Sequence, residues 1–299
     1  MTVSVFWHPS SIKHSAGPDH PESPTRIEAV LAELKASDVP FDVAWHEAEP
    51  AGHDVLTAVH SASYLTRLRD LTAQGGGRLD DDTVANEHSY EAAVHGAGAA
   101  VGAAGCALSG SPAFAATRPP GHHATADTAM GFCLINNIVV AARWALDHAG
   151  LERVLIIDWD VHHGNGTQAL VEKDARIRYV SLHQWPLYPG TGREDERGVG
   201  NIFNVPRPAG LPRTTYVADL NDAVAAATDT WEPELILISA GFDGLAGDPL
   251  AGFTLEPEDY ARWVSAWRGM GVPMATVLEG GYNPARLAQA AVSHLGALA

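Results

Sequence analysis

The stretch VLIIDWDVHHGNGTQ, residues 154–168, decides the fold class of this chain. It begins with four consecutive apolar residues, 154–157, and then places Asp158, Asp160, His162 and His163 within six positions. A continuous apolar run of this length predicts a strand buried on both faces, as in a parallel sheet covered by helices on either side. Two acids and two histidines directly after such a strand predict a polar site at its end.

Five further apolar runs predict strands of the same sheet, at residues 3–7, 113–116, 177–182, 235–239 and 274–278. Helical segments alternate with the strands; they begin at the Ser23-Pro24 pair, cover the stretches near 89–108, 134–148, 214–228 and 257–270, and resume near Pro284. This alternation predicts an α/β fold with a central parallel sheet flanked by helices on both faces. Because we find no internal repeat and no linker-like stretch, we expect one domain over residues 1–299.

The composition narrows the classes of function. Hydrophobic residues make up 46% of the 299 residues, enough for a large core, which excludes a disordered chain. The formal net charge of −17 argues against nucleic acid as a partner and suits either a cationic substrate or simple solubility. With no leader-like start and no membrane-spanning apolar run, we expect a cytoplasmic protein that does not bind membranes. The two cysteines, Cys106 and Cys133, form neither a disulfide framework nor a zinc-type pair.

Polar residues also follow the other predicted strands. The segment 113–116 leads into TRPPGHHA, strand 177–182 into His183, strand 235–239 into SAGFDG, and strand 274–278 into EGGYN. Because ligands of open α/β sheets bind outside the carboxyl ends of the strands, we expect these residues to form one site.

Three of these residues predict a metal site. Asp160 and His162 stand two positions apart at a strand end, so their side chains can point the same way, and Asp243 comes from another strand end. An Asp, His, Asp set leaves an open coordination position, as a catalytic zinc site requires. The alternative is that these residues only cap strands, but two clusters at two buried strand ends favour the metal.

The tandem His122-His123 predicts acid–base chemistry beside this metal. One imidazole can act as a general base for water and the other can serve the leaving group, provided that Asp158 and Asn165 hold their far nitrogens. Tyr282 follows two glycines that let the backbone approach the site, so its phenol can donate to an oxyanion. Taken alone, the histidine pair could be a surface feature and Tyr282 a packed aromatic residue.

The motifs RPPGHHA, GFCLINN, DWDVHHGNGTQ, SAGFDG, GDPLAG and LEGGYN, in this order, resemble the histone deacetylase family, particularly its class II-like and bacterial amidohydrolase branches. The resemblance extends from HPESPTRIEAV, residues 20–30, to the C-terminus. It implies the arginase-deacetylase fold, with a central parallel sheet of about eight strands and one catalytic zinc. Carried over by motif, the zinc ligands are Asp160, His162 and Asp243. The acid–base pair is His122 and His123, with Asp158 behind His122, and Tyr282 is the oxyanion donor.

Finer features of the resemblance concern individual positions. Asn165 stands where class I deacetylases carry Asp, which places the chain with the class II-like members, and the presence of Tyr282 implies full deacetylase chemistry. The family also binds a monovalent cation, K⁺ or Na⁺, which here implies Asp158, the carbonyl region of Asp160 and His162, and Ser181-Leu182. The implied acyl tunnel is lined by Gly131, Phe132, Tyr188 and Leu250. Leu250 stands where the polyamine-selective relative carries Glu, which argues against a polyamine preference.

The function predicted from the sequence is a zinc-dependent amidohydrolase that removes acetyl or other acyl groups from acylated lysine side chains, in peptides or proteins, or from related acylated amines. Three alternatives stay open: an acetylpolyamine amidohydrolase, an arginase-like enzyme with two manganese ions, and a catalytically silent acyl-lysine binding module. His163 stands where the arginase pattern needs a second Asp, which disfavours that alternative. We expect the acidic run 80–82 to form a solvated turn, although it could instead bind substrate at the entrance. The sequence makes no prediction of the oligomeric state.

Overall fold

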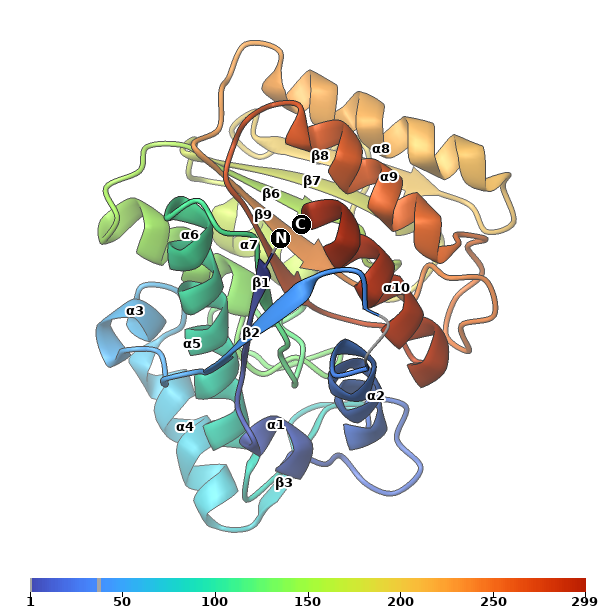
Figure 1. Cartoon of the computed structure of the whole chain (residues 1–299). Coiled ribbons are helices and arrows are strands. Elements are labelled where there is room, and N and C mark those ends of the chain that lie inside the picture. Colours follow the sequence, from blue (N-terminus) through green and yellow to red (C-terminus); the bar gives the residue numbers. More distant parts are fainter. Residues whose placement is uncertain (1, 37–38) are drawn as a thin grey trace.

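A computed structural model describes residues 2–36 and 39–299, and its centre is an eight-stranded sheet (Figure 1). The strand order is β2-β1-β5-β10-β9-β6-β7-β8, and every neighbouring pair is parallel. The strands are β1 (Thr2–Trp7), β2 (Asp42–Glu47), β5 (Ala113–Ala115), β6 (Val154–Asp158), β7 (Ile177–Gln184), β8 (Ile202–Arg207), β9 (Leu235–Ala240) and β10 (Met274–Leu278). The predicted α/β architecture with a parallel sheet of about eight strands is confirmed.

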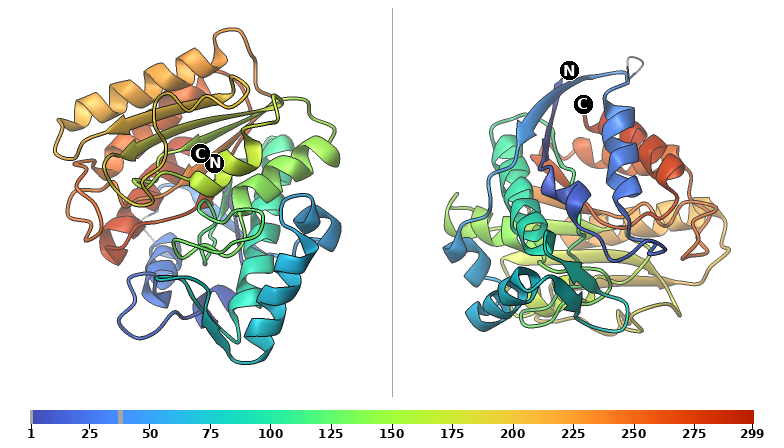
Figure 2. Two further views of the ribbon diagram at one scale, coloured as in Figure 1. Left: turned by 180° about the vertical axis from the view of Figure 1, so that it is seen from behind. Right: turned by 90° about the horizontal axis from the view of Figure 1, so that it is seen from below.

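Helices cover both faces of this sheet (Figures 1 and 2). One face is covered by α2 (Pro24–Leu34), α8 (Arg213–Thr228), α9 (Pro257–Arg268) and α10 (Pro284–Leu298). The other face is covered by α3 (His53–Thr57), α4 (Ala62–Ala73), α5 (Ser89–Leu108), α6 (Asn137–Asp147) and α7 (Asn165–Val171). The short helix α1 (Ser10–Lys13) and an antiparallel pair, β3 (Gly76–Arg78) and β4 (Val84–Asn86), complete the fold. Within the described residues, no helix is both long enough and apolar enough to span a bilayer.

Strand β6 contributes to the core on both of its faces. Leu155 and Ile157 belong to the hydrophobic cluster under α8–α10, whereas Val154 and Ile156 belong to the cluster under α5 and α6. This division follows from the two-residue period of a strand, and it explains why the run is apolar without interruption.

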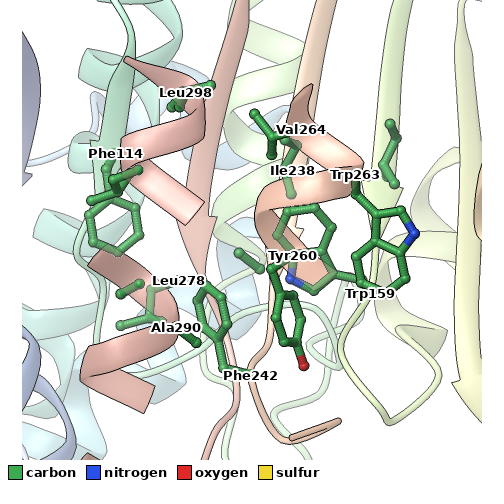
Figure 3. Close-up of a cluster of buried hydrophobic side chains, with 14 of the residues drawn as sticks. Phe114, Trp159, Ile238, Phe242, Tyr260, Trp263, Val264, Leu278, Ala290 and Leu298 are labelled. Atoms are coloured by element: carbon green, nitrogen blue, oxygen red, sulfur yellow. The ribbon is translucent and has the colours of Figure 1, made fainter. Parts of the chain in front are cut away.

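Trp159, directly after β6, anchors the loop that carries the acidic residues. It is fully buried, and its ring stacks on Trp263 of α9 with centroids 5.6 Å apart (Figure 3). Truncating a buried aromatic residue of this kind costs about 3–5 kcal/mol. The carboxyl end of β6 is therefore held firmly against the helical layer.

The structure differs from the sequence prediction at the sheet edges and at one helix start, and it adds α1, α3, α4, α7 and the β3–β4 pair, which were not predicted. All six predicted strands exist, but the edge strands β2 and β8 were not predicted, because β2 is largely half-exposed and β8 contains Pro206. The helix predicted over 134–148 begins only at Asn137, since the Asn136 side chain accepts a hydrogen bond from Val139 N and caps it. Ser23 and Pro24 occupy the predicted N-cap and N1 positions of α2, without a side-chain cap from Ser23.

Candidate active site

The polar residues predicted from the strand ends meet at one edge of the sheet. Strands β5, β10, β9 and β6 are neighbours in that order, and their parallel arrangement brings all four carboxyl ends together. The loops that follow them supply the histidine pair, the tyrosine and the acidic residues of the candidate site. The edge position is the usual ligand site of an open parallel sheet.

Asp160, His162 and Asp243 converge at this edge. The Nδ1 atom of His162 lies 3.0 Å from Asp243 Oδ2 and 3.2 Å from Asp160 Oδ1. Each carboxylate is aimed by a backbone amide, because Gly280 N donates to Asp160 Oδ2 and Val161 N donates to Asp243 Oδ1. Two carboxylate oxygens and one imidazole nitrogen in a buried cluster are a suitable ligand set for a divalent metal.

The electrostatics of this cluster favour a bound cation. Burial alone would lower the pKa of His162, but its bonds to Asp160 and Asp243 outweigh burial and raise the pKa to about 10. Burial and the neighbouring charge of Asp160 raise the pKa of Asp243 to about 7. Two buried carboxylates this close need shared positive charge, which a metal ion supplies.

His122 lies among carboxylates. Its Nδ1 atom is 3.2 Å from Asp158 Oδ2, and its Nε2 atom is 3.7 Å from Asp160 Oδ1. Burial would lower the pKa of His122, but the charges of Asp160 and Asp158 prevail and raise it to about 10. Asp158 is fixed in turn, because the Tyr179 hydroxyl donates to its Oδ2 at 2.9 Å. The surrounding carboxylates therefore favour the cationic form of this imidazole.

His123 has a different partner. Its Nδ1–H donates to the amide oxygen of Asn165 at 2.8 Å, which leaves Nε2 with the lone pair. Burial and the charges of His122 and His162 hold its pKa well below the usual value. The ring lines a cavity, where the Tyr188 ring meets it edge-on with centroids 5.2 Å apart. The predicted assignment of Asp158 to His122 and of Asn165 to His123 matches these hydrogen bonds.

Tyr282 is held by two residues, Asp248 and Arg26, to which the sequence analysis gave no role. Its backbone amide donates to Asp248 Oδ2 at 2.7 Å, and the guanidinium of Arg26 lies 4.9 Å from the centre of its ring. Arg26 Nε also donates to Gly281 O at 2.6 Å, and Glu22 pairs with Arg26 at 3.0 Å. Through these contacts, Asp248 and Arg26 of helix α2 hold the loop after β10 in place.

Gly280 shows why this loop contains two glycines. A Cβ atom at this position would lie 2.3 Å from Asp243 Oδ2 and 2.5 Å from Asp160 Oδ2. Only a residue without a side chain can pass this close to the carboxylates. Gly281, in turn, has a φ of +120°, a conformation that favours glycine.

A cavity of about 230 Å³ opens onto this cluster. Its lining comprises Asp82, His123, Gly131, Phe132, His162, Leu187, Tyr188, Leu250 and Tyr282. All four predicted tunnel residues are among them. The histidine pair contributes the ring of His123, and the candidate metal triad contributes the ring of His162. Apolar and aromatic side chains make up most of the lining. The rings of His123 and His162 are buried, whereas Tyr188 is exposed.

The solvated turn expected for the acidic run 80–82 describes this segment only in part, because Asp82 is half-buried. The turn exists, since Asp80 Oδ1 accepts hydrogen bonds from the amides of Asp82 and Thr83, but Asp82 lines the cavity. Thr83 joins the run to the tunnel wall, because its hydroxyl donates to Asp82 Oδ1 and accepts from Phe132 N. Burial and then the bond to Asp80 raise the pKa of Asp82.

The remaining predicted residues lie beside the cluster. Ser181 of β7 pairs in register with Asp158 of β6, and both Ser181 and Leu182 are buried. His163 stands where an arginase-type second metal would need a carboxylate. Its two ring nitrogens bond instead to Thr191 and Gln168.

Sequence reasoning missed Tyr179, Arg26, Asp248 and Leu187. Arg26 lies inside the quoted stretch HPESPTRIEAV, and Asp248 lies inside GDPLAG, but neither had been given a role. The available signal was a charged residue inside each of these two motifs. Tyr179 and Leu187 carry no such signal, because each belongs to a segment with many apolar residues.

The fold and the site together define a class of protein: an α/β protein with a parallel sheet, a candidate metal-binding triad and a tandem histidine pair beside one cavity. The sequence model of the histone deacetylase domain matches residues 20–298. The chain therefore belongs to the histone deacetylase family, as the sequence motifs indicated, and the expected class of hydrolase is confirmed.

Individual relatives agree with this assignment. The chain is 37% identical to the histone deacetylase-like amidohydrolase of Pseudomonas aeruginosa over 286 residues, covering 92% of this chain and 75% of the relative. The crystal structure of the HDA15 HD domain superimposes with a TM-score of 0.93 at 36% identity, covering 99% of this chain and 90% of that one. An acetylpolyamine aminohydrolase from Burkholderia pseudomallei gives a TM-score of 0.90 at 28% identity, covering 99% and 98%. The arginase-deacetylase fold expected from the sequence is confirmed.

Proposed function

We propose that the protein is a zinc-dependent deacylase that removes acetyl or other acyl groups from acylated lysine side chains or related acylated amines. The observation that carries this proposal is the position of the His123 ring beside the Asp160, His162, Asp243 triad, since both His123 and His162 line one cavity. A metal next to a general base is the arrangement that amide hydrolysis requires.

The ligand set is compatible with zinc. Imidazole and carboxylate groups are both ligands that zinc accepts, and three protein ligands leave a coordination position for the substrate. When bound, zinc would polarise the acyl carbonyl and activate water. A monovalent cation, K⁺ or Na⁺, is proposed beside Asp158, with Ser181, Leu182 and the carbonyls of Asp160 and His162 as its ligands. The register of β6 with β7 supports this second site.

His123 is proposed to move the proton. Because Asn165 accepts its Nδ1–H, Nε2 can take a proton from the attacking water and then deliver it to the leaving amine. His122, held cationic by Asp158 and Asp160, contributes positive charge near the reacting carbonyl rather than a proton. This division of labour follows from the partners of the two rings.

Tyr282 is proposed to donate a hydrogen bond to the oxyanion. Burial raises the pKa of its phenol well above the usual value, so the hydroxyl keeps its proton. Asp248 and Arg26 hold the residue at the cavity wall, which keeps the donor in place before the reaction begins.

The cavity supports an acylated amine on an extended aliphatic chain as the substrate. Phe132 and Tyr188 can enclose methylene groups, and the amide would reach the base of the cavity where His123 and His162 lie. An acetylpolyamine is the second candidate, because a structural neighbour is an acetylpolyamine aminohydrolase and because Asp82 places an acid in the lining. Leu250, an apolar residue in this lining, favours the acyl-lysine substrate.

The test is a substrate screen with one preparation of known metal content. Acetyl-lysine peptides, acetylpolyamines and longer acyl-lysines are compared by kcat/KM, and bound metal is identified by mass spectrometry. We expect one zinc per chain and turnover of acyl-lysine peptides. Two manganese ions per chain would support the arginase-like alternative, and a zinc-loaded protein without turnover of any substrate would support the silent binding module.

A further inference from the structure

Glu279, the first residue after β10, is a fully buried carboxylate to which the proposed chemistry gives no task. Its Oε2 atom accepts hydrogen bonds from Gly121 N at 2.6 Å and from His122 N at 3.2 Å. Its Oε1 atom accepts a bond from the Ser239 hydroxyl at 3.0 Å. Both oxygens are therefore committed to protein donors rather than directed into the cavity.

These bonds connect two of the loops that build the site with strand β9. Gly121 and His122 belong to the loop after β5, Ser239 lies within β9, and Glu279 begins the loop that carries Tyr282. The backbone of Glu279 adds to the connection, because its amide donates to Ala240 O at 3.0 Å. The histidine pair and Tyr282, which lie in different loops, are thus fixed to one another through a single side chain.

The backbone amides of Gly121 and His122 form a particular kind of cradle. Two successive amides that point at one oxygen are a nest for an anion, and a carboxylate fills it well. Without an acceptor these buried amides would lose their partner, at a cost that the loop can avoid only by moving. A shift of about 1 Å in a catalytic group is enough to lower a rate by about 10²-fold.

We infer that Glu279 is a positioning residue that holds the tandem histidine loop in register with the tyrosine loop. It acts through the backbone of Gly121 and His122 and does not touch the substrate. The kinetic part of this inference rests on the proposed deacylase function, whereas the positioning part does not.

The test compares Glu279→Ala with Glu279→Gln. Glutamine keeps an oxygen for the two amides and a side chain of the same shape, so its kcat should stay within about tenfold of the wild type. Alanine empties the nest, and kcat should fall by about 10²-fold with KM nearly unchanged. Zinc content and thermal unfolding are measured for every variant, so that loss of metal or of fold is recognised.

The matched control is Asp259→Asn. Asp259 is as buried as Glu279, but its partners are Glu256 and Arg262 in the region of α9. This variant should lose stability while keeping kcat. If Asp259→Asn lowers kcat as much as Glu279→Ala, the effect is general destabilisation and the inference is wrong.

A second readout does not depend on activity. Amide hydrogen exchange at Gly121 and His122 should be faster in Glu279→Ala than in the wild type and nearly unchanged in Glu279→Gln. Equal exchange in the alanine variant, or a glutamine variant as impaired as alanine in kcat, would overturn the inference. If the wild type hydrolyses no acylated amine, the proposed function fails, and the exchange comparison still decides the role of Glu279.

Discussion

His122 and His123 are adjacent in the chain, but their surroundings are opposite. His122 faces the carboxylates of Asp158 and Asp160, whereas His123 faces the neutral amide of Asn165 and the edge of an aromatic ring. As a result the pKa of His122 rises to about 10, while that of His123 falls well below its usual value. The partner of each imidazole, and not the imidazole itself, therefore decides which of the two can accept a proton near neutral pH.

Both rings lie next to candidate metal ligands, His122 beside Asp160 and His123 beside His162. Loss of the metal should therefore have the largest effect on activity. Asp243→Ala removes one triad ligand without touching the bonds of either histidine to Asp158 or Asn165. We expect zinc retention and amide hydrolysis to be lost together, measured by mass spectrometry and by turnover of an acetylated peptide. Full activity in a metal-free preparation of this variant would show that the triad is not the catalytic centre.

Replacing each histidine in turn tests the difference between them. His123→Ala removes the proposed proton carrier, and general acid–base catalysis typically contributes about 10²–10⁴-fold, so kcat should fall by that factor while substrate still binds. His122→Ala should lower kcat by less, because only a charge is lost. A larger loss in His122→Ala than in His123→Ala would reverse the assigned roles.

Tyr282→Phe examines the third group around the substrate without disturbing either histidine. The ring and its contact with Arg26 remain, and only the hydroxyl is removed. Loss of one oxyanion donor lowers kcat by about 10²–10³-fold, with little change in KM or zinc content. An unchanged kcat would make Tyr282 a packed aromatic residue, and a rise in KM alone would make it a binding residue.

Asn165→Asp makes the two environments alike. A carboxylate behind His123 would stabilise its cationic form and raise its pKa above the depressed value in the wild type. Since the base must be neutral to accept a proton, the acidic limb of the profile of kcat/KM against pH should move to higher pH. We expect a change in rate of less than about tenfold at high pH, where the ring is neutral in both proteins. If the acidic limb does not move, it does not report the protonation of His123.

The sequence predicted those parts of the molecule whose signals are local. The central strands have uninterrupted apolar runs, and Asp160, His162, Asp243 and the histidine pair each lie within a few residues of a strand end. The edge strands β2 and β8 were not predicted, because β2 is partly exposed along its whole length and β8 contains Pro206.

The supporting residues could not be predicted from spacing. Arg26 bonds to Gly281, 255 positions away in the chain, and only the folded structure brings them together. Asp82 was expected in a solvated turn because acidic runs are usually exposed, yet the contact of Thr83 with Phe132 brings it to the cavity. Long-range contacts of this kind leave no pattern in a single sequence.

The central claim is that the two neighbouring histidines carry different protonation states in the working enzyme. The most direct measurement is ¹⁵N nuclear magnetic resonance of the imidazole nitrogens in the zinc-loaded protein near pH 7, with His122→Ala and His123→Ala used to assign the signals. We expect both ring nitrogens of His122 to carry protons and His123 to be neutral with its proton on Nδ1. A cationic His123 beside a neutral His122 would contradict this expectation.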